Sequence, residues 1–355
     1  MPAFAESTAE PPLADSYYAL LRGGNKADEC ASAPPPGCQA PPVSECELPM
    51  IDVGCLTACG GGTEERAACA AAIASAAAEW GFLQVVNHGV KQELLEAMRR
   101  EQVRLFRLPF EAKATAGLLN DSYRWGSPTA TSPRQLSWSE AFHVPLAGIS
   151  GSPCSYGELT SISLCVCGRC RDVTQEVANA MSKLANTLAC VLAESLGHTA
   201  GQRFPEGCDE RTCFLRLNRY PPCPFSPDAF GLVPHTDSDF LTVLCQDQVG
   251  GLQLMKGSRW VAVKPIPGAL IVNIGDLFQA WSNNRYKSVE HKVVTNATTE
   301  RYSVAYFLCP SYDSPIGACE EPSPYRTFTF GEYRRRVQED VKKTGKKIGL
   351  PNFLL

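Results

Sequence analysis

The sequence of 355 residues has no run of about 18 apolar residues, and it therefore predicts no transmembrane helix. It has no basic excess, because 33 Lys and Arg residues stand against 37 Asp and Glu residues. This balance argues against a nucleic acid or an anionic membrane as partner. The first residues lack a basic segment followed by an apolar one, which argues against a secretory signal. We expect a cytoplasmic protein that is free to diffuse into the nucleus.

Cysteine, by contrast, is abundant. The 17 cysteines are an odd number spread from Cys30 to Cys319, whereas a secreted disulfide scaffold would be shorter and denser. The stretch 154–170 contains Cys165, Cys167 and Cys170, a spacing that resembles part of a zinc knuckle, but no fourth ligand is evident nearby. Free, reduced thiols are the favoured interpretation.

The hydrophobic pattern changes along the chain. Helices are expected at 64–80, 91–107 and 172–196, where apolar positions recur in steps of three and four or helix formers dominate. Short β-branched and aromatic runs then follow at 213–220, 239–246, 251–255, 259–265, 269–274, 288–295 and 301–309. Short strands at this spacing predict an antiparallel sandwich or barrel. A last, basic helix is expected at 331–343.

Histidine is scarce, with five in the chain, and two of them lie in the β-rich region. His235 precedes Asp237 by two residues, and residues i and i+2 of an extended segment point to the same side. Alternation places His291 among valines on an inward face, where an unpaired imidazole would cost about 1–3 kcal/mol. Taken alone, His291 is more simply a core histidine that is bonded to a carbonyl group.

Ten residues after His291, period-2 alternation places Arg301 and Ser303 on one face of a strand. An inward arginine beside a hydroxyl suits a bidentate grip on a carboxylate, although an arginine at a strand end often pairs with a local acid. Together, two histidines and one aspartate form a facial triad with open coordination positions, which is typical of non-haem Fe(II) oxygenases. A structural zinc site would need four closed ligands.

Several segments resemble the plant 2-oxoglutarate- and Fe(II)-dependent dioxygenases. They are NRYPPCP (218–224), HTDSDF (235–240), QVGGLQL (248–254), NIGDLFQAWSN (273–283), YKSVEHKVV (286–294), RYSVAYF (301–307) and, nearer the N-terminus, EWGFLQVVNHGV (79–90). The resemblance covers residue 48 to the C-terminus. It implies a mainly β fold with flanking helices, built on a double-stranded β-helix (jelly roll) core.

The resemblance also implies a division of the chain and a set of site residues. The expected parts are a flexible N-terminal arm (1–47), a helical N-terminal dioxygenase domain (48–205) and a β-helix domain with a C-terminal helix (206–355). His235, Asp237 and His291 match the metal ligands of the family. Arg301 and Ser303 match the site of the 2-oxoglutarate C5-carboxylate, Tyr220 matches another contact of that co-substrate, and Asn218 is a candidate behind it. The implied cofactors are Fe(II), 2-oxoglutarate and O2, and ascorbate is expected to support activity.

Within the family, the stretches 119–131, 137–146, 230–256 and 307–314 look closest to gibberellin 2-oxidases that act on C20 precursors. This resemblance implies a small-molecule diterpenoid substrate that is hydroxylated at C2, which would inactivate the hormone. Arg124, Ser139 and Tyr312 are among the candidate substrate contacts. Two alternatives stay open: a dioxygenase of another gibberellin carbon, a flavonoid or another specialised metabolite, and a catalytically silent hormone-binding protein. The sequence leaves the oligomeric state open.

Overall fold

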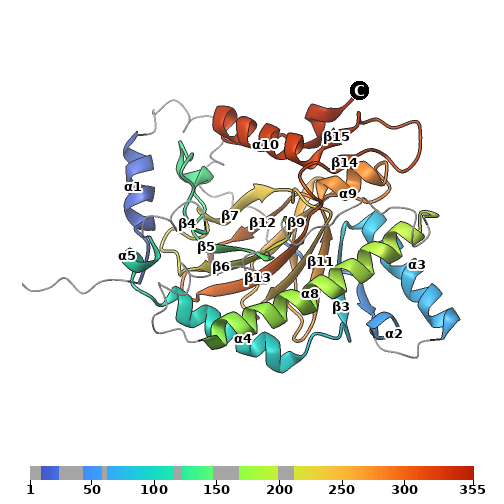
Figure 1. The fold of residues 1–355 in the computed structure, drawn as a ribbon. Coiled ribbons are helices and arrows are strands. Elements are labelled where there is room, and N and C mark those ends of the chain that lie inside the picture. Colours follow the sequence, from blue (N-terminus) through green and yellow to red (C-terminus); the bar gives the residue numbers. More distant parts are fainter. Residues whose placement is uncertain (1–8, 24–42, 58–61, 115–121, 147–167, 199–211) are drawn as a thin grey trace, which may run out of the picture.

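The computed structural model describes residues 9–23, 43–57, 62–114, 122–146, 168–198 and 212–355 (Figure 1). Two β-sheets form the centre of the fold. The larger sheet has the strand order β2-β3-β11-β8-β13-β6-β5-β4, and the smaller has the order β1-β10-β9-β12-β7. Among the described residues, no helix combines the length and apolar character needed to cross a bilayer.

The strands of the larger sheet are β2 (Met50–Asp52), β3 (Phe82–Val86), β4 (Tyr123–Trp125), β5 (Glu140–Pro145), β6 (Phe214–Tyr220), β8 (Leu241–Gln246), β11 (Leu270–Ile274) and β13 (Arg301–Leu308). Those of the smaller sheet are β1 (Glu45–Cys46), β7 (Phe230–His235), β9 (Leu252–Lys256), β10 (Arg259–Val263) and β12 (His291–Val294). A hairpin of β14 (Pro315–Ile316) and β15 (Phe328–Thr329) stands apart.

The two sheets face each other across one apolar layer. Phe82, Tyr220 and Ile271 of the larger sheet pack in the same buried cluster as Leu254 and Val293 of the smaller one. Residues that alternate inward on each strand fill the space between the sheets, as in other β-sandwiches. The expected mainly β core with flanking helices is therefore confirmed.

Helices cover the outer face of the larger sheet. They are α2 (Gly54–Thr57), α3 (Thr63–Glu79), α4 (Gln92–Phe106), α5 (Phe110–Lys113) and α8 (Gly168–Glu194). The helices α1 (Leu13–Gly23), α9 (Asp276–Trp281) and α10 (Phe330–Thr344) lie elsewhere. Two short 3-10 helices are η2 (Pro133–Gln135) and η3 (Leu350–Phe353). The long helix α8 crosses the sheet beside α4 and α3 (Figure 1). Its buried side chains Val177, Met181, Leu184 and Leu188 recur in steps of three and four.

The segment expected to be a flexible arm contains the helix α1. Leu13 and Tyr17 are buried, and the ring of Tyr17 stacks on Phe225 with centroids 3.9 Å apart. An apolar pair four residues apart lets this short helix pack beside Trp138, so part of the expected arm is helical. The strands β2 to β5 join the same sheet as later strands, so the expected division at residue 205 cuts through one sheet.

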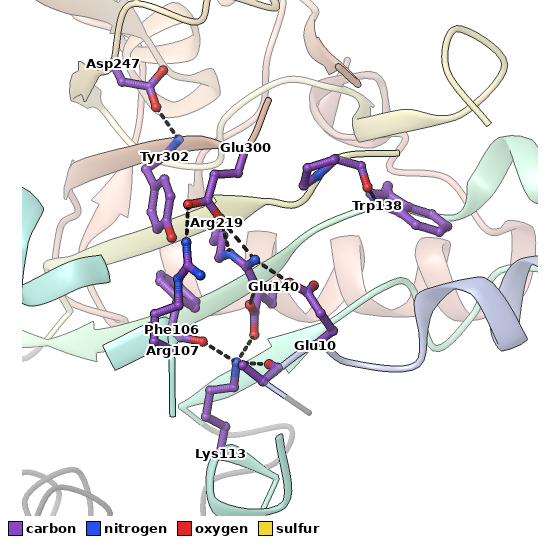
Figure 2. Close-up of polar contacts among 12 residues, drawn as sticks. Glu10, Phe106, Arg107, Lys113, Trp138, Glu140, Arg219, Asp247, Glu300 and Tyr302 are labelled. Carbon is purple, nitrogen blue, oxygen red and sulfur yellow. Dashed lines mark hydrogen bonds and ion pairs between the residues drawn. The ribbon is translucent and has the colours of Figure 1, made fainter. Parts of the chain in front are cut away.

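A buried charged cluster connects several elements behind the larger sheet (Figure 2). Lys113 of α5 and Glu140 of β5 are both inaccessible to solvent, and the Lys113 Nζ lies 2.7 Å from the Glu140 Oε2. The second oxygen of Glu140 accepts a hydrogen bond of 2.7 Å from Arg219 Nη1. Arg219 in turn pairs with Glu300 at 3.1 Å and with Glu10 at 2.5 Å. A chain of alternating charges therefore joins the N-terminal segment to β5, β6 and the start of β13.

Candidate functional site

His235 and His291 are opposite each other on neighbouring strands of the smaller sheet. They are direct partners in the β7–β12 pairing, and their ring centroids are 4.3 Å apart. Each Nδ1 lies near a carbonyl oxygen, at 2.9 Å from Val233 and at 3.0 Å from Val289. A carbonyl can only accept a hydrogen bond, so each Nδ1 carries the proton and each Nε2 has a free lone pair.

Asp237 follows the end of β7, and its two oxygens have different partners. The Oδ1 lies 3.6 Å from the Nε2 of His235 and 3.8 Å from the Nε2 of His291. The Oδ2 accepts hydrogen bonds from Thr242 Oγ1 at 2.7 Å and from Asn273 Nδ2 at 2.8 Å. Strands β8 and β11 therefore fix the carboxylate by one oxygen and leave the other facing the imidazoles.

The three ligand-type atoms lie within 4.8 Å of one another, and no other such group occurs in the described part of the chain. The structure thus brings together the three residues that the sequence analysis singled out. Asp237 does not reach the histidines by the expected strand alternation, because β7 ends at His235 and Asp237 lies beyond it. Its position depends on the turn rather than on strand alternation.

The electrostatics of this group favour metal-binding protonation states. Burial alone would raise the pKa of Asp237, but the two imidazoles and the two hydrogen bonds outweigh it and lower the pKa to about 2. Burial, with His291 nearby, lowers the pKa of His235 to about 3. A carboxylate and a neutral imidazole are the forms that coordinate a metal ion, so these residues fit a divalent cation such as Fe(II).

A second carboxyl group, that of Asp239, supports the first. The hydroxyl of Thr242 lies 2.8 Å from Asp239 Oδ2 as well as 2.7 Å from Asp237 Oδ2, and one hydroxyl proton cannot serve both acceptors. Burial and the Asp237 charge raise the pKa of Asp239 well above its usual value. A protonated Asp239 can donate to Thr242, which then donates to Asp237.

Residues later in the chain also hold the turn after β7 through hydrogen bonds and an ion pair. The amide of Asp276 donates to the carbonyl oxygen of Asp237 at 2.9 Å. The Asp276 side chain accepts hydrogen bonds from Thr236 and Tyr333 and pairs with Lys347 at 2.8 Å. Lys347 also donates to the carbonyl oxygen of Thr236 at 2.8 Å. The C-terminal part of the chain therefore supports the turn that carries Asp237.

Arg301 is buried at the start of β13, and only some of its N–H groups have hydrogen-bond partners. Its Nη2 donates to Gln246 Oε1 at 2.8 Å, and its guanidinium lies 4.9 Å from the centre of the Tyr220 ring. Its Nε and Nη1 are buried and have no hydrogen-bond partner among the described residues. A buried guanidinium with unpaired N–H groups suits a carboxylate, which accepts charge-assisted hydrogen bonds, so Arg301 fits a carboxylate of a co-substrate.

The other expected contacts flank Arg301 on the same face. In the β13–β6 pairing, Arg301 is opposite Tyr220 and Ser303 is opposite Asn218. The Asn218 amide donates weakly to the Ser303 hydroxyl at 3.4 Å. The structure thus places all seven predicted site residues between the two sheets. Their individual roles stay predictions.

Sequence reasoning missed some residues of this layer. Thr242 and Asn273, which orient Asp237, carry no spacing signal because their contact with Asp237 depends on how β8 and β11 lie beside it. Arg216 lies on the inner face two residues before Asn218, and extending the alternation along 214–220 would have found it. Of the cysteine-rich stretch, Cys165 and Cys167 lie outside the described residues, whereas Cys170 lies at the start of α8.

Comparison with known proteins gives the class. A model of the 2OG-Fe(II) oxygenase superfamily matches residues 211–310, and one described as "non-haem dioxygenase in morphine synthesis N-terminal" matches residues 48–157. The solved structure titled "Crystal structure of JOX2 in complex with 2OG, Fe, and JA" is similar with a TM-score of 0.72 and 30% identity over 99% of this chain and 100% of that one. The fold and the site are those of a 2-oxoglutarate- and Fe(II)-dependent oxygenase.

Two relatives with high sequence identity narrow this class. Gibberellin 2-beta-dioxygenase 6 of Oryza sativa subsp. japonica is 67% identical over 99% of this chain and 98% of that protein. Gibberellin 2-beta-dioxygenase 8 of Arabidopsis thaliana is 51% identical over 97% of this chain and 98% of that protein. The chain belongs to the gibberellin 2-beta-dioxygenase family of the 2OG-Fe(II) oxygenases. It is an enzyme, and its cofactors are Fe(II), 2-oxoglutarate and O2.

Proposed function

We propose that this enzyme hydroxylates gibberellins or their C20 precursors at C2 in the 2β configuration and thereby inactivates them. One gibberellin, one 2-oxoglutarate and one O2 would give the hydroxylated gibberellin, succinate and CO2. The observation that carries the proposal is the cluster of His235, Asp237 and His291 beside an unsatisfied Arg301, in a chain that is 67% identical to a gibberellin 2-beta-dioxygenase.

The chain's own residues would each have a defined task. His235 and His291 would bind Fe(II) through Nε2, and Asp237 would bind it through Oδ1. When bound, iron and 2-oxoglutarate together supply the activation of O2 that lets an unactivated C–H bond be hydroxylated. Arg301 would hold the far carboxylate of 2-oxoglutarate with Ser303 and Tyr220, and Asn218 would position Ser303. The apolar layer between the sheets excludes water from this space.

The remaining expectations concern the setting of the enzyme. We infer a cytoplasmic enzyme that diffuses into the nucleus and whose partner is a small diterpenoid acid rather than nucleic acid or a membrane. We also keep the division of the sequence into a helical part (48–205) and a β-helix part (206–355). Because both parts contribute strands to the larger sheet, we infer that they fold as one unit.

The test is an assay of the purified enzyme with Fe(II), 2-oxoglutarate and ascorbate. C20 and C19 gibberellins and a flavonoid are supplied in parallel, and succinate and the hydroxylated product are measured. We expect 2β-hydroxylation of a gibberellin with succinate formed in equal amount. Hydroxylation at another carbon, or of the flavonoid alone, would reject the substrate assignment, and bound iron without any succinate would indicate a silent hormone-binding protein.

The metal assignment needs its own variant. Asp237→Ala should abolish Fe(II) binding and turnover, because the Oδ1 that faces both imidazoles is lost. The matched control is Asp228→Ala, since Asp228 follows the PPCP segment and lies outside the site. Fe(II) titration and the melting temperature are measured for both. Retained turnover in Asp237→Ala would remove this residue from the ligand set.

A further inference from the structure

Arg216 lies on β6 with its side chain toward the interior of the two sheets. It shares its face of the strand with Asn218 and Tyr220 because they are two and four residues away. In the β13–β6 pairing it is opposite Ala305, two residues beyond Ser303. Its Nε donates to Asn218 Oδ1 at 3.0 Å. Arg216 therefore occupies the row next to the proposed 2-oxoglutarate contacts.

Arg216 forms no ion pair with any described residue. Among the described residues, no carboxylate lies within ion-pair distance of its guanidinium, and its only hydrogen bond is the one to Asn218. Burial lowers the pKa of Arg216. The charges of Tyr220 and Asp237 oppose this shift only in part, and the guanidinium of Arg124 adds to it. Arg219 on the opposite face, by contrast, pairs with three carboxylates. A partly buried cation without a partner is costly unless an anion arrives to meet it.

Further cations lie near Arg216. His143 of β5 is its partner in the β5–β6 pairing, and burial, followed by the charges of Arg216, Arg124 and Arg334, lowers the pKa of His143 to about 4. Three guanidinium groups thus act on one imidazole. Several guanidinium groups therefore lie near the region beyond Ser303, and they would attract an anionic molecule.

An apolar wall adjoins this positive region. Phe214 and Phe307 are partners in the β6–β13 pairing, and their rings stack with centroids 4.4 Å apart. Both rings are partly exposed, on the same face as Arg216. The small side chain of Ala305 lies opposite Arg216 and adds no bulk over the guanidinium. A cation beside an aromatic surface suits a molecule with an apolar skeleton and a carboxylate.

We propose that Arg216 binds a carboxylate of the substrate and so determines which acids the enzyme accepts. The inference rests on the proposed function, because it assumes that the substrate is a gibberellin. The apolar skeleton would lie against Phe214 and Phe307 while the carboxylate forms an ion pair with Arg216. Arg216 would thereby give substrate specificity, in a row of the sheet separate from Arg301, which holds the co-substrate.

The test compares gibberellin free acids with their monomethyl esters in the wild type, Arg216→Met and Arg216→Lys. We expect KM for the free acid to rise by about 30-fold or more in Arg216→Met, the usual consequence of removing one partner of a close charge pair. Arg216→Lys should lose less, since it keeps the charge but not the fork. The wild type should discriminate against one of the esters, and Arg216→Met should treat that ester and the acid alike.

Controls separate this role from a structural one. In Arg216→Met, KM for 2-oxoglutarate should change far less than KM for the acid, because Arg301, Ser303 and Tyr220 remain, and the melting temperature should not fall. Arg259→Met, which removes an exposed arginine from β10, should behave as the wild type. An Arg216→Met enzyme with wild-type KM, or one that still prefers the acid over the ester, would overturn the inference. A wild-type enzyme that converts no gibberellin would overturn the proposed function first, before any variant is compared.

Discussion

The two oxygens of the Asp237 carboxylate have different roles, which neighbouring side chains determine. Thr242 and Asn273 hold one oxygen by hydrogen bonds of 2.7 and 2.8 Å, and the other oxygen remains for a metal ion. Such supporting bonds commonly orient metal ligands and adjust their basicity. The position of Asp237 therefore depends on residues that are 5 and 36 positions away in the sequence.

Gly275 is the residue that permits this close arrangement. A Cβ added there would lie 2.1 Å from both the backbone oxygen and the Oδ1 of Asp239. We expect Gly275→Ala to displace the turn after β7 and lower the free energy of unfolding by about 1–3 kcal/mol, the usual cost of overpacking. Fe(II) affinity should fall with it. Thermal melting and Fe(II) titration measure the two effects.

The matched control for this variant is Gly62→Ala. A Cβ at Gly62 would meet nothing within 4 Å, and its φ of −63° suits alanine. Its stability should change by about 1 kcal/mol or less, the range for an N-cap glycine. Equal melting temperatures for the two variants would contradict the assignment of Gly275 as a packing constraint.

At the scale of single residues, the sequence predicted which residues would meet but not how they are held. Alternation around His291 correctly placed its imidazole inward, and the spacing of Arg301 and Ser303 correctly placed both on one inner face. The carbonyl partners of the two histidines and the Gln246 partner of Arg301 depend on strand register. Register is a tertiary property that a linear pattern does not contain.

Among the elements, the C-terminal segment after α10 supports the turn that carries Asp237. Lys347 contacts both Thr236 and Asp276, and its side chain is largely buried. We expect Lys347→Met to lower the free energy of unfolding by about 1–3 kcal/mol, because Asp276 keeps its charge but loses its cation. Fe(II) affinity should also fall. Lys346→Met, at the exposed neighbouring position, should leave both properties unchanged.

The two lysine variants are compared by urea unfolding of the metal-free protein and by Fe(II) titration. If Lys347→Met and Lys346→Met unfolded at the same urea concentration, the C-terminal segment would have no part in holding the turn. A loss of stability without a loss of Fe(II) affinity would limit Lys347 to a general structural role.

The helices and strands were predictable to different degrees. The helices α3, α4 and α8 lie within a few residues of their predicted positions, because long amphipathic or alanine-rich segments give a repeated signal. The strand β7 was missed because its sequence FGLVPH contains Gly and Pro, and its pairing with β12 supplies what its composition lacks. The helix α9 was missed because its six residues follow a strand without an N-cap side chain.

At the scale of the whole molecule, burial of imidazoles inside a positive interior should make the fold sensitive to acid. The pKa of His143 is lowered from 6.5 to about 4 by burial and by three arginines. Between these pH values the unfolded chain binds more protons than the folded chain, so stability falls as the pH falls. The expected slope is about 1.4 kcal/mol per pH unit for this residue, and it ends below pH 4.

Urea unfolding of the metal-free protein at pH 7, 6 and 5 measures this slope. His143→Asn should remove the contribution of His143 and flatten the profile. His198→Asn, which removes an imidazole that packs on Trp281 instead, should keep the wild-type slope. An unchanged profile in His143→Asn would show that other groups cause the acid sensitivity.

The charged cluster behind the larger sheet gives the extreme N-terminal segment an unexpected importance. Ala9 supplies a carbonyl acceptor to Lys113, and Glu10 supplies one of the carboxylates around Arg219 (Figure 2). Trimming the chain past residue 10, a routine step when an extension looks dispensable, would therefore remove two partners from fully desolvated cations. Part of what resembles a tail thus completes a buried charged cluster of this enzyme, and its removal would affect the start of the strand that begins with Arg301.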